Sequence, residues 1–153
     1  MTGMAERNPE DLTDRDILTT RLLGAPRERV YGAWTDPGQL ARWWGPEGFT
    51  NEFEAFDPRP GGHWRFTMRA PDGTGFPNHS VFRELLPPER IVFDHLSGPH
   101  FQVTTTFAEA AGGTLLSFRM RFASVEECEA IKRYALVGNE QVFDRLAALL
   151  AEG

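Results

Sequence analysis

The last stretch of the chain, from Ser124 to Ala151, constrains the fold more than any other segment. Its apolar residues recur every three or four positions, which is the period of an amphipathic helix. They are Val125, Cys128, Ile131, Ala135, Val142, Leu146, Leu149 and Leu150. Ser124 followed by Glu127 forms a capping-box pattern at the start of this helix. The helix would be roughly 40 Å long, so its apolar stripe needs one extended partner surface from the upstream chain.

Most of the upstream chain has a period of two, which predicts a sheet. We expect strands at 16–23, 50–56, 63–69, 79–86, 90–96, 101–107 and 114–122, with two short helices at 26–34 and 37–44. Short turns between consecutive strands favour antiparallel pairing, and strands followed by a helix indicate an α+β fold with the helix on one face of the sheet. We expect a flexible arm at 1–14 and one domain at 15–153.

Composition and charge argue against several classes of function. The net charge of -6 disfavours a nucleic-acid partner, because phosphate binding needs a basic surface. No apolar run approaches the ~18 residues of a membrane span and no signal-peptide pattern starts the chain, so we expect a cytoplasmic protein without a membrane partner. Cys128 is the single cysteine, and its place on the apolar helix stripe predicts a packed, inert thiol.

The common catalytic motifs are missing from the sequence. There is no Gly-x-Ser-x-Gly elbow, no phosphate-binding glycine loop, no His-Glu-x-x-His and no pair of cysteines. His63, His79 and His95 lie on three successive predicted strands. Alternation directs His63 away from the face of Trp64, whereas His95 shares the inner face with Phe93. We therefore expect no convergent metal ligands, no cofactor and no built-in catalytic residue.

The chain is rich in aromatic residues, with four tryptophans and twelve phenylalanines that can fill a core or line a cavity. Trp43, Trp44 and Trp64 fit both interpretations. As core residues they close the space between the short helices and the sheet, and as cavity residues they offer flat faces and indole N–H groups to a ligand. In the long helix, Gly138 indicates a kink or a close approach of a strand or ligand. Gln141 either faces solvent or hydrogen-bonds into the cavity.

The strand at 79–86 carries polar residues whose direction alternation leaves open. If Val81 faces inward, His79 and Arg83 share that face, and in the opposite register Glu84 does. A charged group there needs an ion-pair partner or a ligand in a wet cavity, because burying it unpaired is costly. The candidate cavity residues are Trp43, Trp44, Trp64, Phe66, Met68, His79, Val81, Arg83, Phe93, His95, Tyr134, Gly138 and Gln141.

Six segments together resemble one known family. They read APRERV at 25–30, AWTDP at 33–37, LARWWGP at 40–46, RPGGHWRF at 59–66, PPERIV at 87–92 and GGT at 112–114. The chain resembles the bacterial branch of the proteins named activator of the ninety-kilodalton heat-shock protein ATPase homologue. These belong to the START-like superfamily, also called SRPBCC or birch-allergen-like. The resemblance implies a helix-grip fold, in which a curved seven-stranded antiparallel sheet wraps around the long C-terminal helix and leaves a cavity.

Three hypotheses for function follow, of which we favour the first. The chain is a binding module that carries a small hydrophobic or aromatic molecule, or an enzyme of the polyketide cyclase, aromatase or hydrolase type with His79, His95 or Glu84 as acid or base. The third hypothesis is a protein-interaction module with an ATPase chaperone or another partner. Only a short polar segment precedes the first strand, so we expect no direct transfer of chaperone activation. A homodimer through an exposed strand or helix face is compatible with all three hypotheses.

Overall fold

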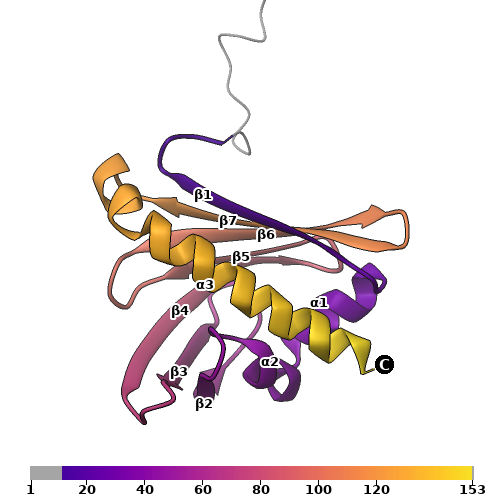
Figure 1. Ribbon diagram of the computed structural model, residues 1–153, viewed down its shortest axis with the longest axis horizontal. Helices are drawn as coiled ribbons and strands as arrows, with labels where there is room; N and C mark the ends of the chain where they lie inside the picture. The colour runs from indigo at the N-terminus through magenta and orange to yellow at the C-terminus, as the bar shows by residue number, and fades with distance from the viewer. Residues whose placement is uncertain (1–11, 153) are drawn as a thin grey trace, which may run out of the picture.

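A computed structural model describes residues 12–152, in which one curved sheet wraps around the C-terminal helix (Figure 1). The strands are β1 (Asp16–Leu23), β2 (Thr50–Phe56), β3 (His63–Arg69), β4 (Gly75–Leu86), β5 (Arg90–His95), β6 (Phe101–Ala110) and β7 (Gly113–Phe122). The helices are α1 (Arg27–Thr35), α2 (Pro37–Trp43) and α3 (Val125–Ala151). The predicted α+β helix-grip fold is thereby confirmed. Most of the expected flexible arm, residues 1–11, lies outside the described residues.

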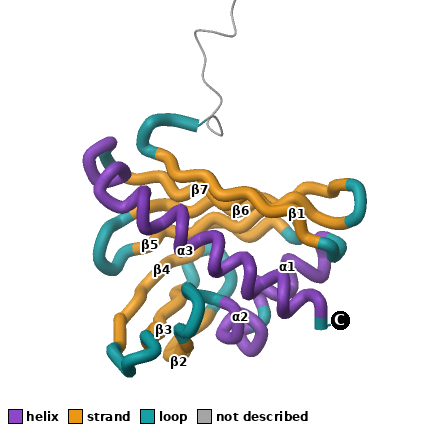
Figure 2. The backbone as a smooth tube through the Cα atoms, viewed as in Figure 1, coloured by secondary structure: helices purple, strands orange, loops and turns teal. Residues whose placement is uncertain are grey.

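The sheet is antiparallel throughout, with the order β1-β7-β6-β5-β4-β3-β2. Strands β2 to β7 are neighbours in chain order, because short connections let each strand turn back beside the one before it. β1 completes the sheet by pairing with β7. α1 and α2 form the connection between β1 and β2 and lie near the C-terminal end of α3 (Figure 2).

β4 is longer than the predicted strand, since it begins at Gly75 rather than His79. It pairs with β3 from Gly75 opposite Arg69 to Val81 opposite His63. Pro77 lies within this ladder although it lacks a backbone N–H, which is why the sequence discourages a strand there. The extension adds Asn78 to the inner face of the sheet, one of the residues that line the cavity described below.

A bulge in β4 decides the register that the sequence leaves open. The pairing with β5 shifts between Phe82, which is opposite Phe93, and Glu84, which is opposite Val92. Phe82 is buried in the core, while Arg83 and Glu84 both lie on the outer face in ion pairs with Asp94 and Arg90. Both registers considered from the sequence were therefore wrong, because each assumed unbroken alternation along the strand. The extra residue of a bulge moves the residues that follow it to the opposite face of the sheet.

α3 begins as predicted, since the Ser124 hydroxyl accepts a hydrogen bond from the Glu127 backbone N–H at 3.1 Å. Its apolar stripe packs on the inner face of the sheet, and Cys128 and Leu146 are fully buried. Burying a leucine side chain contributes about 1.5–3 kcal/mol, so this stripe is a major source of the stability of the fold. Burial raises the pKa of the Cys128 thiol, in keeping with the predicted packed, unreactive cysteine.

None of the helices within residues 12–152 is both long enough and apolar enough to cross a membrane.

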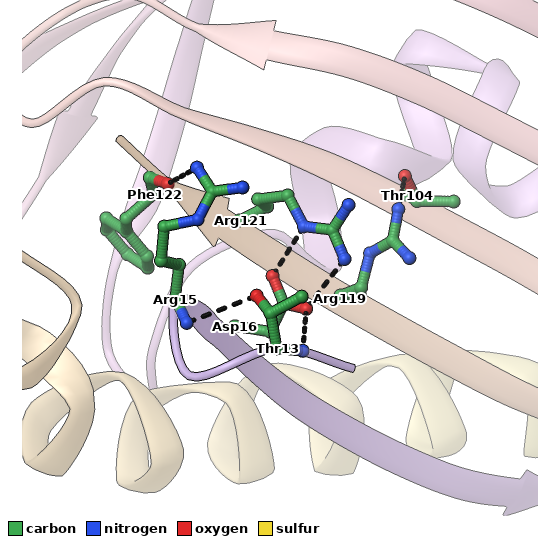
Figure 3. A network of polar contacts seen from close by, with 7 residues as sticks. All are labelled: Thr13, Arg15, Asp16, Thr104, Arg119, Arg121 and Phe122. Atoms are coloured by element: carbon green, nitrogen blue, oxygen red, sulfur yellow. Dashed lines mark hydrogen bonds and ion pairs between the residues drawn. The ribbon is translucent and has the colours of Figure 1, made fainter. Parts of the chain in front are cut away.

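β1 is attached to β7 by a buried ion pair as well as by its backbone ladder (Figure 3). Arg121 donates from Nε and Nη2 to the two carboxylate oxygens of Asp16, at 2.7 and 2.8 Å. The Thr13 backbone N–H donates to the same carboxylate, and the Arg15 side chain donates to the Phe122 carbonyl. This network fixes the start of the edge strand against its neighbour.

Candidate functional site

A cavity of about 330 Å³ lies between α3 and the inner face of the sheet. Its floor is formed by residues of β3 to β7, α3 covers it, and the loop that follows α2 closes one side. None of the described residues that line it is Asp, Glu, Lys or Arg. The cavity is therefore an uncharged space in which aromatic and aliphatic side chains predominate.

A second hollow, of about 510 Å³, lies where residues 24–28 meet the turn between β6 and β7. It is larger but is lined mostly by glycine, alanine and charged residues, with Arg27 3.8 Å from Glu109. None of the described side chains around it is aromatic. Ligand pockets are usually apolar with a few convergent polar groups, so the cavity beneath α3 is the better candidate.

Aromatic rings form one end of the cavity beneath α3. Trp64 is central to this group, with ring centroids 5.2 Å from Trp44, 5.0 Å from Phe66 and 5.5 Å from Phe93. These tilted, stacked and edge-to-face contacts are favourable geometries for aromatic pairs and hold the rings in fixed orientations. The cavity therefore offers flat, preorganised walls to a ligand.

Polar groups gather on the floor of the cavity in a row across three strands. Trp64 of β3 is paired with Ser80 of β4, and Ser80 is paired with His95 of β5. Trp64 and Ser80 are buried, with exposed fractions of 1% and 2%. The Trp64 indole N–H has no hydrogen-bond partner within the described part of the chain. The row Trp64–Ser80–His95 thus provides polar contacts inside a largely apolar space.

His95 is the titratable residue of this row. Its Nδ1 lies 3.1 Å from the Pro99 carbonyl oxygen, and its Nε2 lies 3.1 Å from Oδ1 of Asn78. The ring stacks on Phe101 with centroids 4.4 Å apart. Burial is the main cause of a lowered pKa for His95, which favours the neutral imidazole.

Two side chains of α3 hold the loop that closes one side of the cavity. Arg145 donates from Nη1 to the carbonyl oxygens of Trp44, Gly45 and Pro46, at 3.1, 2.8 and 2.9 Å. Gln141 Oε1 accepts a hydrogen bond from the backbone N–H of Glu47 at 3.2 Å. The helix thus fixes residues 44–47, three of which line the cavity.

The structure brings most of the sequence-predicted residues to this cavity. Those that line it are Trp44, Trp64, Phe66, Met68, Phe93, His95, Tyr134 and Gly138. Trp43 does not, because it is fully buried in the core and its indole N–H donates to the Ala33 carbonyl at 3.0 Å. Gln141 is bound to the loop after α2 and does not line the cavity.

The register of β4 places three of the candidate residues, His79, Val81 and Arg83, outside the cavity lining. These residues alternate with Ser80 and Phe82 and do not line the cavity. His79 Nε2 is 2.8 Å from His63 Nδ1. Arg83 Nε donates to Asp94 at 2.6 Å, which is the ion pair that the sequence leaves as the alternative to a ligand contact.

The histidines consequently lie on both sides of the sheet, with His63 and His79 together and His95 in the cavity. Within residues 12–152, no group of three or more His, Cys, Asp or Glu side chains is arranged to hold a metal ion. A convergent ligand set of this kind is what a protein metal site requires.

Several cavity residues were not among the predicted set. Asn78 was missed because the predicted strand began at His79, four residues after the start of β4, and Ser80 because the register was open. Phe101, Val103, Phe118 and Met120 lie on the apolar faces of their strands, but alternation alone does not separate cavity walls from packed core. Arg145 was missed as well, although the free carbonyl groups at the end of α2 need donors and are a signal for such a residue.

Residues 24–151 match the family model described as Activator of Hsp90 ATPase homolog 1-like protein. The chain belongs to this family. It has the START-like fold of the family, and solved structures agree. A protein from Chromobacterium violaceum is 33% identical, with a TM-score of 0.80 over 88% of this chain and 96% of that chain.

Two proteins of lower sequence identity share the fold. A protein from Nitrosomonas europaea has a TM-score of 0.85 at 21% identity, over 95% of this chain and 99% of that chain. The AHSA1 protein from Silicibacter pomeroyi has a TM-score of 0.76 at 21% identity, over 90% of this chain and 98% of that chain. At this identity the likeness concerns the fold alone. No curated protein matches the chain.

Proposed function

We propose that this family member binds a small hydrophobic or aromatic molecule in the cavity beneath α3. The observation that carries the proposal is the cavity itself, which has a volume of about 330 Å³, aromatic walls and no charged lining residue among those described. This volume is near the lower end of the range of ligand pockets, about 300–1,000 Å³, so the proposed ligand has one or two rings. Burial of its apolar surface would drive binding.

A thermal-shift screen with small aromatic compounds, followed by native mass spectrometry, tests the proposal. A ligand present at about 100 times its Kd stabilises the folded state by about 2.7 kcal/mol. For a chain of this size we expect Tm to rise by roughly 5–10 °C. If neither method detects binding by any compound, the proposal fails.

A cavity-filling variant gives the matched control for this screen. A Cβ atom at Gly138 would meet nothing within 4 Å, and this residue lines the cavity. Gly138→Leu should therefore occupy the space of the ligand and abolish the thermal shift. Gly138→Ala adds little volume and should retain most of it. Equal shifts in the two variants would place the bound compound elsewhere on the protein.

Acid–base catalysis is a second candidate function, supported by His95. Its neutral imidazole lies in the cavity wall, where it could accept a proton from the carbon next to a carbonyl group. Of the other residues considered for this role, Glu84 is ion-paired with Arg90 and His79 does not line the cavity. Deuterium exchange into benzoylacetone, followed by NMR, tests the idea. An exchange rate no higher with wild-type protein than with His95→Gln would exclude it.

The description of the family names an activator of the Hsp90 ATPase, and this activity is a separate proposal for the chain. Its test is the ATPase rate of a bacterial Hsp90 with and without this protein. A rate that rises in proportion to complex formation supports the proposal, and no stimulation at micromolar concentration contradicts it.

A further inference from the structure

The cavity has two unlike walls, and this difference carries information about the ligand. On the α3 side the wall is mainly apolar, with Ile131, Ala135 and Val142. Asn139 is also on this side, but its amide nitrogen donates to Thr19 Oγ1 at 3.1 Å. On the sheet side the row Trp64–Ser80–His95 places three residues with polar groups on neighbouring strands. A ligand that matches both walls has one polar edge and one apolar face.

Trp64 provides the sharpest constraint on the polar edge. Its indole N–H is buried without a partner in the described structure, and an indole nitrogen can only donate a hydrogen bond. Leaving such a donor unpaired costs free energy, which a ligand oxygen would recover by accepting the bond. Trp43 differs in this respect, because its N–H is already bound to the Ala33 carbonyl.

The lining also constrains the charge of the ligand. None of the described lining residues is Lys or Arg, and burial lowers the pKa of His95 and so favours its neutral form. An ionised carboxylate or phosphate in this space would lose its hydration without gaining an ion pair, which is strongly unfavourable. The same reasoning applies to a cationic ligand, since no described Asp or Glu lines the cavity.

We propose that the cavity selects uncharged, flat aromatic molecules that carry an oxygen acceptor on one edge, and that the Trp64 indole N–H binds this oxygen. The proposal rests on the proposed ligand-binding function and names its ligand class. The acceptor is a carbonyl, ether or hydroxyl oxygen that faces the sheet, while the aromatic rings lie against the apolar side chains of α3.

Four two-ring probes separate the parts of this proposal: naphthalene, 2-methoxynaphthalene, 2-naphthol and 2-naphthoate. They are titrated into the full chain by isothermal titration calorimetry, with the protein in the syringe because naphthalene is sparingly soluble. We expect 2-naphthol and 2-methoxynaphthalene to bind about five- to tenfold more tightly than naphthalene, in proportion to one buried hydrogen bond. We expect 2-naphthoate not to bind.

Trp64→Phe removes the indole N–H but keeps an aromatic ring. It should weaken 2-methoxynaphthalene by about five- to tenfold and change the affinity for naphthalene by less than about twofold. The matched control is Trp34→Phe, because Trp34 is also buried with an unpaired N–H but does not line the cavity. This control should leave the affinities of both probes unchanged.

The outcomes distinguish this proposal from the function on which it rests. Binding of all four probes with equal affinity, or tight binding of 2-naphthoate, would overturn the ligand class and leave ligand binding intact. If no probe binds, the proposed function itself fails. Should Trp64→Phe not fold, the comparison of 2-methoxynaphthalene with naphthalene on wild-type protein still decides whether an acceptor oxygen is recognised.

Discussion

Asp16 carries a charge on an almost completely buried side chain. Its side chain is 1% exposed, and that of its partner Arg121 is 21% exposed. Taking two charges out of water is costly, and here the two parallel hydrogen bonds between them offset that cost. Removing one partner leaves the other charge buried without an ion-pair partner. The loss of either side chain should therefore destabilise the folded state strongly.

Asp16→Asn should lower the free energy of unfolding by about 3 kcal/mol, because Arg121 then loses its charged acceptor. Urea unfolding followed by circular dichroism measures the change. Glu52→Gln is the control, since the Glu52–Arg69 pair is exposed and such pairs contribute at most about 1 kcal/mol. Equal decreases in the free energy of unfolding in the two variants would show that burial does not make the Asp16–Arg121 pair more important for stability than an exposed pair.

His95 should make the stability of the protein depend on pH. Burial lowers its pKa from the usual 6.5, with a smaller opposing contribution from its hydrogen bond to Pro99. The unfolded chain therefore binds the proton more readily, so the contribution of His95 is complete above about pH 6.5 and is lost as the pH falls through the folded-state pKa.

The prediction is that the free energy of unfolding falls less between pH 7 and pH 5 in His95→Gln than in the wild type. Burial also lowers the pKa of His79, so His79→Gln serves as the comparison on the outer face. NMR titration of the His95 ring gives the pKa directly. A value at or above 6.5 would contradict the neutral imidazole on which the cavity chemistry depends.

Among the elements, α3 was the most predictable and β4 the least. The apolar stripe and the Ser124 cap define α3 by local chemistry alone, and both are present in the structure. β4 departs from its pattern in two ways that depend on its neighbours: Pro77 is tolerated within the ladder, and a bulge follows Phe82. A bulge changes the face of the following residues, but nothing in a single strand's sequence specifies where the partner strand will require one.

Gly138 weakens α3 without a steric reason, because a Cβ atom there would meet nothing within 4 Å. Gly138→Ala should stabilise the protein by about 0.5–1 kcal/mol, the difference in helix propensity, and raise Tm by roughly 1–4 °C. Gly113→Ala should do the opposite and cost more than about 1 kcal/mol, since its Cβ would clash with the Leu23 carbonyl oxygen. Scanning calorimetry of both variants measures these shifts. A destabilised Gly138→Ala would indicate that the helix needs flexibility or close packing at this position.

At the scale of the whole molecule, the sequence predicted the sheet and the long helix that packs on it. It predicted only some of the residues that line the cavity between them. Alternation identified Trp64, Phe66 and Phe93 as inward residues, and all three line the cavity. It did not distinguish Trp44, which lines the cavity, from Trp43, which is packed in the core beside it. That distinction depends on how α2 and its loop dock against α3, which is set by tertiary contacts such as those of Arg145 and not by local periodicity.

Arg145 links these parts of the molecule, because one side chain of α3 binds the carbonyl groups of residues 42 and 44–46. Arg145→Met keeps the apolar stem but removes every donor, so the loop that closes this side of the cavity should open more often. We expect faster amide hydrogen exchange at residues 44–47, measured by mass spectrometry, while the strands keep their protection.

The matched control is Arg133→Met, which removes an exposed arginine from the same helix and should leave exchange in the loop unchanged. If the ligand enters and leaves past residues 44–47, opening of this loop should limit both amide exchange and ligand dissociation. The rate of ligand dissociation should then rise in Arg145→Met by about the same factor as the exchange rate of the loop. Faster exchange without faster dissociation would mean that the ligand passes elsewhere, between α3 and the β3–β4 hairpin. Unchanged exchange at 44–47 would show that Arg145 does not restrain the loop, and that the aromatic contacts of Trp44 are sufficient to hold it.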